Sequence, residues 1–240
     1  MAKRQLLALE RDIVSCRLCP RLVRHREAAA ATPPRRYQGQ VYWARPVPAF
    51  GDPLARLLVV GLAPAAHGGN RTGRMFTGDR SGDWLYEALH RFGFANQPTS
   101  TQPGDGLLLR DAFITAVARC APPGNKPTRH ELLRCRPYLE GEIALLRRIR
   151  VAVALGKIAF DGTLAAWEGL GRPVPRPRPR FAHGRRARLP GGTLLIASYH
   201  PSQQNTFTGR LTRAMFHGVF REAREALDRV PDPADGKVVS

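Results

Sequence analysis

The stretch from Gly61 to Asp79 holds the largest concentration of residues in this chain that can bind or react with a ligand. It reads GLAPAAHGGNRTGRMFTGD and directly follows the apolar run Leu57–Val60. The stretch has five glycines, two arginines, a histidine, a phenylalanine and a carboxylate. An ordinary loop needs only one or two special backbone positions. We therefore interpret this stretch as a backbone that closes tightly around a flat or anionic ligand.

Three other apolar runs also end in residues that can do chemistry. Each run and the segment after it are Ala112–Val117 with Arg119–Thr128, Val151–Leu155 with Gly156–Lys157, and Leu194–Ala197 with Ser198–Asn205. The runs lack clean polar alternation, as expected of parallel strands that are covered on both faces. Ligands of such sheets bind beyond the carboxyl ends of the strands. We therefore expect all four loops to converge on one site.

The four cysteines form two pairs, Cys16 with Cys19 (C-x2-C) and Cys120 with Cys135 (C-x14-C). They lie among arginines and prolines or beside a loop, and not inside apolar runs, where cysteines that are only core residues would lie. The spacing is typical of a site with four thiolate ligands. Such a site suits both Zn2+ and an iron–sulfur cluster, although the wide second pair fits a zinc ribbon poorly. It would join segments more than 100 residues apart, which favours one domain.

The chain is strongly basic, with 38 Lys and Arg against 19 Asp and Glu and a formal net charge of +19. A charge excess of this size attracts polyanions, of which nucleic acid comes first and an anionic membrane surface second. No segment approaches the ~20 apolar residues that a membrane span requires. The N-terminal residues also lack the apolar core of a signal peptide. We expect a cytoplasmic protein with reduced cysteines.

Helical patterns lie between the apolar runs, which predicts an α/β layer fold with right-handed crossovers. Two of the helices are expected over Ile158–Trp167 and Met215–Leu227. The segment Arg172–Arg188, rich in arginine and proline, is expected to cross the surface of the same domain and to contact phosphates. We expect residues 1–230 to form one domain and residues 231–240 to form a disordered tail.

Residue types that begin or end helices mark the boundaries of two other helices. Ser81 is expected to cap a helix that Gly93 ends. Thr128 and Glu131 have the spacing of a capping box. Pro137 is expected to end the helix that this box opens and to begin the next one.

Four segments together resemble the type-5 uracil-DNA glycosylases, and so does the arrangement of the four cysteines. The segments are Gly61–Arg74, FTGD at 76–79, GNKPT at 124–128 and HPSQQN at 200–205. The resemblance covers the chain from about Cys16 to Val230 and implies a three-layer αβα sandwich with a four-stranded parallel sheet. It also implies a structural [4Fe-4S] cluster and hydrolysis of the N-glycosidic bond of uracil and other deaminated or modified bases in DNA. The implied cluster ligands are Cys16, Cys19, Cys120 and Cys135.

The first motif departs from the wider superfamily. Many other uracil-DNA glycosylases carry an Asp or Asn shortly after the opening glycine to position the water molecule. Here the stretch Leu62–Ala66 has no polar side chain, and Asp79 is the nearest carboxylate in the motif. The resemblance therefore leaves the activation of water to another residue.

The predicted catalytic residues are Asp79, Asn125 and His200. His200 is expected to donate a hydrogen bond to the base oxygen on which negative charge develops. Asp79 is expected to stabilise the cationic sugar or to orient water, and its alternative role is to cap the following helix. Asn125 is expected to read the base edge or to position water, and its alternative role is that of a turn residue.

Phe76 is expected to stack on a base that has been extruded from the helix. The other predicted substrate-binding residues are Gly61, Ala63, Gln203 and Asn205. The predicted DNA-binding residues are Arg71, Arg74, Arg210 and Arg213. We expect a monomer that acts on DNA at the bacterial nucleoid, without a membrane partner.

Two other functions use part of the same evidence. A metal-stapled DNA-binding module without catalysis would need the charge and the cysteines, but neither His200 nor the glycine-rich loop. A nucleotide-binding enzyme is the second alternative, because glycine loops after strands also cradle phosphates. The stretch Gly61–Asp79 fits neither of the two common nucleotide-binding spacings.

Overall fold

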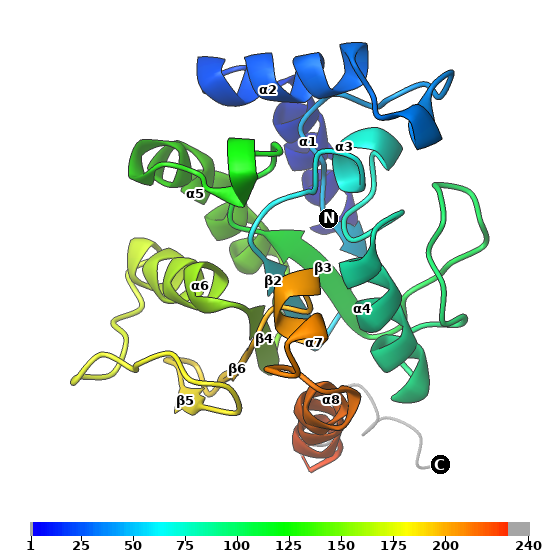
Figure 1. Ribbon diagram of the computed structural model, residues 1–240. Helices are drawn as coiled ribbons and strands as arrows, with labels where there is room; N and C mark the ends of the chain where they lie inside the picture. Colours follow the sequence, from blue (N-terminus) through cyan, green and yellow to red (C-terminus); the bar gives the residue numbers. More distant parts are fainter. Residues whose placement is uncertain (1, 230–240) are drawn as a thin grey trace, which may run out of the picture.

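Six strands form one sheet in the computed structural model, which describes residues 2–229 (Figure 1). The strands are β1 (Phe50–Gly51), β2 (Leu57–Gly61), β3 (Ala112–Ala116), β4 (Val151–Leu155), β5 (Arg186–Arg188) and β6 (Leu194–Ser198). The helices are α1 (Ala2–Ser15), α2 (Pro20–Ala31), α3 (Gly69–Thr72), α4 (Arg80–Arg91), α5 (Arg129–Leu145), α6 (Lys157–Gly169), α7 (Gln203–Phe207) and α8 (Arg213–Asp228). The tail predicted over residues 231–240 lies outside the described residues.

The sheet has the strand order β1-β3-β2-β4-β6-β5. Its four central strands are parallel, and Val59 of β2 pairs with Ile114 of β3 and with Val153 of β4. These are the four predicted strands. The two edge strands β1 and β5 pair antiparallel, so the expected four-stranded sheet has six strands. Strands this short carry too few residues to show a hydrophobic pattern in the sequence.

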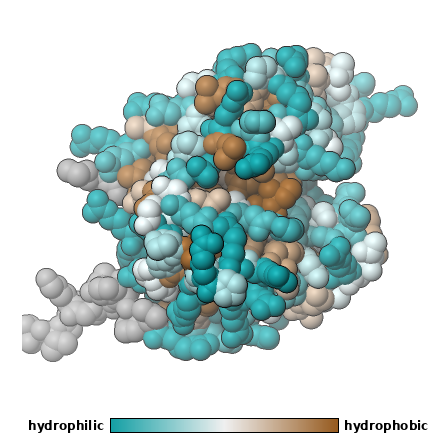
Figure 2. All heavy atoms as spheres, turned by 90° about the vertical axis from the view of Figure 1, so that its left-hand side faces the viewer, coloured by the Kyte–Doolittle hydropathy of each residue, from teal (hydrophilic) through white to brown (hydrophobic). Residues whose placement is uncertain are grey.

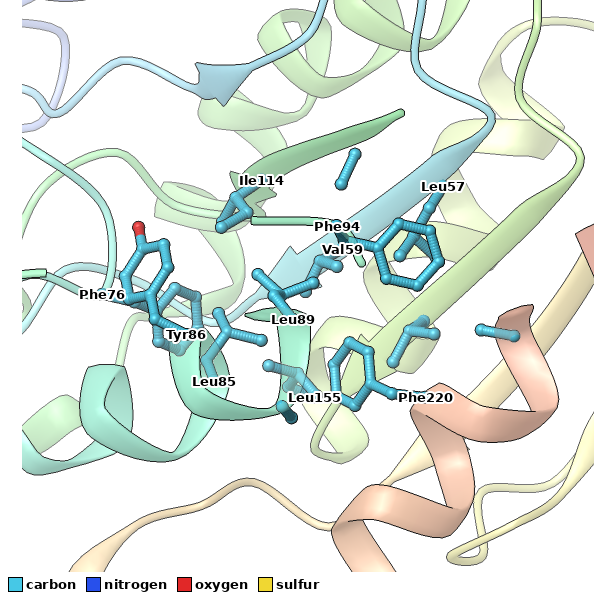
Figure 3. Close-up of a cluster of buried hydrophobic side chains, with 14 of the residues drawn as sticks. Leu57, Val59, Phe76, Leu85, Tyr86, Leu89, Phe94, Ile114, Leu155 and Phe220 are labelled. Atoms are coloured by element: carbon cyan, nitrogen blue, oxygen red, sulfur yellow. The ribbon is translucent and has the colours of Figure 1, made fainter. Parts of the chain in front are cut away.

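Helices cover both faces of the sheet, which confirms the predicted three-layer αβα sandwich. Leu57 and Val59 face the helices α4 and α8, and the cluster of hydrophobic side chains on this side is shown in Figure 3. Leu58 and Val60 face α5 and α6 on the other side. Because both faces are covered, every residue of the four parallel strands is buried.

Two of the predicted helix boundaries are wrong. The N-cap of α4 is Asp79, whose Oδ1 accepts a hydrogen bond from Gly82 N at 3.0 Å, and Ser81 lies within the first turn. The helix α5 continues through Pro137 to Leu145. Its buried residues Leu139 and Ile143 pack beneath the sheet, and this burial outweighs the lost backbone hydrogen bond.

The predictions for the start of α5 and for the path of the arginine-rich segment Arg172–Arg188 agree with the structure. Thr128 and Glu131 form the predicted capping box. The segment Arg172–Arg188 lies against the same core, because Val174 is buried and Phe181 packs edge to face on Phe160 at 5.8 Å. The face of the molecule that carries α5, α6 and β5 is mostly hydrophilic, with small separate hydrophobic areas (Figure 2). None of the helices between residues 2 and 229 has the length and apolarity needed to cross a membrane.

Candidate active site

The glycine-rich loop between β2 and α4 contains the short helix α3 in its middle. Two glycines allow its close approaches. A Cβ atom at Gly61 would lie 2.7 Å from the ring of Phe76, and a Cβ atom at Gly68 would collide with the carboxylate of Asp79. A larger residue at either position would therefore displace a predicted site residue.

Phe76 stacks against the imidazole of His200, with ring centroids 6.0 Å apart and an interplanar angle of 29°. Phe76 comes from the loop after β2 and His200 from the loop after β6, so the ends of two strands meet here as predicted. Phe76 is 8% exposed and has a positive φ of 53°, which is unfavourable for a bulky residue. The hydroxyl of Tyr86, beside Phe76 in Figure 3, donates to the carbonyl oxygen of Met75 at 2.8 Å and holds this turn in place.

His200 is held as a neutral imidazole. Burial lowers its pKa to about 4, so the ring carries no charge at pH 7. A neutral imidazole has one N–H donor and one acceptor nitrogen. His200 can therefore donate a hydrogen bond to a ligand oxygen without bringing a positive charge into the site.

The carboxylate of Asp79 caps the helix α4 with one oxygen and contacts the glycine-rich loop with the other. Its Oδ1 caps α4, and its Oδ2 lies against Gly68. Burial raises the pKa of Asp79, and backbone hydrogen bonds from Gly82 and Ser81 oppose this shift. The capping role weighed from the sequence is therefore real.

The loop that carries His200 is held by its own next residues. The Nδ2 of Asn205 donates to the carbonyl oxygen of His200 at 2.9 Å, and Ser202 caps α7 through its side-chain oxygen. Gln203 is exposed on α7. Asn205 therefore positions the His200 backbone, whereas the side chain of Gln203 is available to a ligand.

His183 also supports the His200 loop, and sequence reasoning did not select it. Its Nδ1 accepts a hydrogen bond from the backbone N of Tyr199 at 3.1 Å, and the two rings lie 5.1 Å apart. The guanidinium of Arg210 lies 4.7 Å from the centre of the Tyr199 ring. The only signal in the sequence was a histidine within a basic segment, so the contact was not predictable.

The predicted DNA contact of Arg74 is wrong, because its side chain points inward and is 7% exposed. Its guanidinium makes two hydrogen bonds to Asp105, at 3.0 and 2.6 Å, and also binds Thr77 and Ser100. All three nitrogens of the guanidinium are engaged by protein groups, through four hydrogen bonds. Asp105 lies 31 residues away in the chain, so the sequence pattern around Arg74 could not reveal this partner.

The other three predicted DNA-binding arginines differ in their surroundings. Arg71 is half-buried and donates to the carbonyl oxygen of His67 and to Gln40, both at 2.9 Å, so it braces the loop. Arg210 and Arg213 are exposed. Arg213 also forms an ion pair with Glu87 at 2.9 Å.

The two remaining predicted residues lie in the loops after β2 and β3. Ala63 is half-buried two residues beyond the end of β2. Asn125 is exposed in a 3-10 turn and has a φ of 57°. Its side-chain amide makes no hydrogen bond in the part of the chain that the structure describes, so the amide is available to a ligand or water.

The four cysteines line one small cavity, which we call the cysteine cavity (Cys16, Cys19, Cys120 and Cys135). All four are free thiols. Burial raises the pKa of Cys120 to about 11 and that of Cys135 to about 12. The buried Arg26 donates through Nη1 to the Sγ atom of Cys120 at 3.0 Å. The structure thus brings the two predicted cysteine pairs together.

Comparison with known proteins identifies the family. The model of the uracil DNA glycosylase superfamily matches residues 48–224. A type-5 uracil-DNA glycosylase from Thermus thermophilus is 54% identical over 90% of this chain and 96% of its own. One from Mycobacterium leprae is 52% identical over 90% and 93%, and a type-4 enzyme from Pyrobaculum aerophilum is 32% identical over 80% and 89%. The chain belongs to the uracil-DNA glycosylase superfamily and, within it, to the type-5 uracil-DNA glycosylases.

Proposed function

We propose that this protein is a DNA glycosylase that hydrolyses the N-glycosidic bond of uracil in DNA and leaves an abasic site. The observation that carries the proposal is the stacked pair of Phe76 and His200, together with Asp79, which caps α4 three residues after Phe76 in the same loop. Type-5 uracil-DNA glycosylases that share more than half of its residues support uracil as the substrate. Other deaminated or modified bases are further substrates, and the enzyme acts as a monomer at the bacterial nucleoid.

The base must leave the helix before it can react, which costs a few kcal/mol. Phe76 stacks on the extruded base, and such stacking contributes about 1–3 kcal/mol. Gly61 leaves room for the Phe76 ring at the end of β2, and the half-buried Ala63, two residues further on, is assigned to the wall of the base pocket. The exposed side chain of Gln203 is assigned to contact with the DNA strand from which the base has been extruded.

As the C1′–N bond breaks, its electron pair moves onto the base and negative charge grows on the base oxygen. The neutral imidazole of His200 donates a hydrogen bond to that oxygen. A donor aimed in advance at such a charge contributes about 2.7–4 kcal/mol. Burial keeps the imidazole neutral at pH 7, and the neutral ring can donate this hydrogen bond without first binding a proton.

The sugar becomes electron-poor as the base leaves, and the oxygen of a water molecule then bonds to C1′. Asp79 stabilises the developing positive charge with its second oxygen and accepts the proton that water releases. Its raised pKa favours that acceptance. Asn125 orients the water through its free amide.

We also propose that the cysteine cavity holds a [4Fe-4S] cluster. Arg26 and Arg119 are buried at the cavity, and their side chains have N–H groups without an acceptor among residues 2–229, namely Nε of Arg26 and Nε and Nη1 of Arg119. A buried donor without a partner costs about 1–3 kcal/mol. A cluster bound by four thiolates is anionic and supplies sulfur acceptors, so these donors support the proposal.

Zn2+ is the alternative occupant of this cavity. A single zinc ion needs its thiolates about 2.3 Å from one point. Within the described residues, no three His, Cys, Asp or Glu side chains converge in this way. A [4Fe-4S] cluster takes four thiolate ligands, which the two cysteine pairs would supply. When bound, the cluster cross-links the N-terminal segment to the loop after β3, and no catalytic step passes through it.

A single-turnover assay on a uracil-containing oligonucleotide tests the proposed reaction. We expect strand cleavage after alkali with uracil and with hypoxanthine, and none with undamaged DNA. Iron content and the visible absorption of the same preparation test the cluster. Protein that contains its cluster but cleaves no damaged substrate would establish the non-catalytic DNA-binding module instead.

A further inference from the structure

A basic groove runs between α1 and the segment around Trp43, away from the catalytic residues. Its hollow measures about 770 Å3. It is lined by the arginines Arg4, Arg11, Arg17, Arg26 and Arg45 and by Trp43. Glu10 is the single acidic residue among the described residues that line it. The groove therefore has a strong excess of positive charge around one exposed aromatic ring.

Three of these arginines lack an ion pair within the described residues, and the guanidinium of Arg45 lies 5.9 Å from the centre of the Trp43 ring. Arg4, Arg11 and Arg45 are exposed and form neither a hydrogen bond nor an ion pair with any residue from 2 to 229. Arg17 differs, because it pairs with Glu27 at 2.8 Å. On α1, Arg4 and Arg11 are seven residues apart and so lie on the same side of the helix. Unpaired guanidinium groups on one side of a groove fit a row of phosphates.

The groove is joined rigidly to the glycine-rich loop. The backbone N of Trp43 donates to the carbonyl oxygen of Arg71 at 2.9 Å, and that of Ala44 donates to Asn70 at 3.0 Å. The indole of Trp43 packs so closely on Gly73 that a Cβ atom there would lie 2.9 Å from it. The same loop carries Phe76 and Asp79, so a strand that leaves the site along this loop meets the groove.

We propose that this groove, defined by Arg4, Arg11, Arg45 and Trp43, binds the phosphate backbone of the DNA that flanks the damaged base. The proposal rests on the proposed function for its choice of polyanion. The two arginines of the glycine-rich loop hold protein groups, so the loop itself offers the DNA little charge on this side. The groove supplies that charge from α1 and from the segment that backs the loop.

The test is the salt dependence of binding to undamaged duplex DNA, measured by fluorescence anisotropy. The groove variant combines Arg4→Gln, Arg11→Gln and Arg45→Gln. The matched control combines Arg91→Gln, Arg110→Gln and Arg147→Gln. It removes the same charge from exposed arginines that form no side-chain hydrogen bond or ion pair among residues 2–229 and lie at the end of α4, before β3 and after α5. The binding constant K falls as salt rises, and each lost phosphate contact makes the negative slope of log K against log salt concentration shallower by about 0.9.

We expect the magnitude of this slope to fall by about 2–3 in the groove variant and by less than about 1 in the control. Equal slopes in the two variants, or an unchanged slope in the groove variant, would overturn the proposal. The result is separate from the proposed reaction, because undamaged DNA requires no cleavage. Wild-type protein that fails to cleave uracil-containing DNA would overturn the proposed glycosylase reaction. The slopes would still show whether the groove binds DNA.

Discussion

His200 shows how burial alone can prepare a side chain for catalysis. Its pKa falls from the ordinary value of 6.5 to about 4 because burial disfavours the charged ring, although the residue as a whole is half-buried. Phe76 covers one face of the ring, and Asn205 holds the backbone below it. The result is a neutral donor at the point where the leaving base gains charge.

The pH dependence of the reaction follows from this pKa. We expect His200 to change the single-turnover rate on uracil-containing DNA less than about twofold between pH 7.5 and 6, because it stays neutral throughout; an Asp79→Ser variant shows this without the carboxylate, whose pKa is also raised. The stability that the neutral ring contributes is present above pH 6.5 and is lost as the pH falls through about 4, since the unfolded chain binds a proton first. A rate that falls with a midpoint near 6.5 would contradict the role of a buried neutral His200.

Two substitutions separate the catalytic role of Asp79 from its capping role. Asp79→Ser keeps a good N-cap and removes the carboxylate, whereas Asp79→Ala removes both. We expect both variants to cleave at least tenfold more slowly, and only the alanine variant to lose about 1 kcal/mol of stability. Single-turnover rates and thermal denaturation measure the two effects. A serine variant with a normal rate would show that Asp79 only caps α4.

The elements of the site are held by pairs that are distant in the chain. Arg74 with Asp105 ties the glycine-rich loop to the segment that precedes β3, and His183 ties the arginine-rich segment to the end of β6. The capping box at Thr128 is local, and the sequence predicted it correctly. The prediction that Pro137 ends the helix is wrong, because packing against the sheet keeps α5 continuous. Local signals thus predicted one start and one end correctly, the Thr128 cap of α5 and the stop of α4 before Gly93, and failed at the N-cap of α4 and at Pro137.

The corrected role of Arg74 can be tested through stability. Arg74→Met leaves Asp105 buried without its charge partner, and breaking such a pair costs about 3–5 kcal/mol. We expect the melting temperature to fall by roughly 10 °C and the salt dependence of DNA binding to stay unchanged. The double variant with Asp105→Asn should recover part of the loss. A weaker salt dependence with normal stability would return Arg74 to the DNA interface.

At the scale of the whole molecule, the cysteine cavity joins the first two helices to the α/β sandwich. Cys16 and Cys19 lie at the junction of α1 and α2, whereas Cys120 follows β3 and Cys135 lies in α5. The N-terminal helices therefore share a cavity with a loop that also leads to Asn125.

Removal of one thiol tests this connection. We expect Cys16→Ser to lose iron and visible absorption and to denature at a lower temperature, because the N-terminal helices lose their cross-link. Ser15→Ala, at the neighbouring exposed position, is the control. A colourless Cys16→Ser variant that keeps the wild-type melting temperature and cleavage rate would show that the ligands are assigned wrongly.

The sequence alone determined the four parallel strands, the family, the grouping of the cysteines and the loops that carry Phe76 and His200. These features depend on apolar runs and motifs whose residues are neighbours in the chain. The tertiary structure alone decided that Arg74 binds Asp105, that His183 supports Tyr199, and that Trp43 and α1 enclose a basic groove. A charged or aromatic side chain has many partners of suitable chemistry along the chain, and only the packing of distant segments selects one of them.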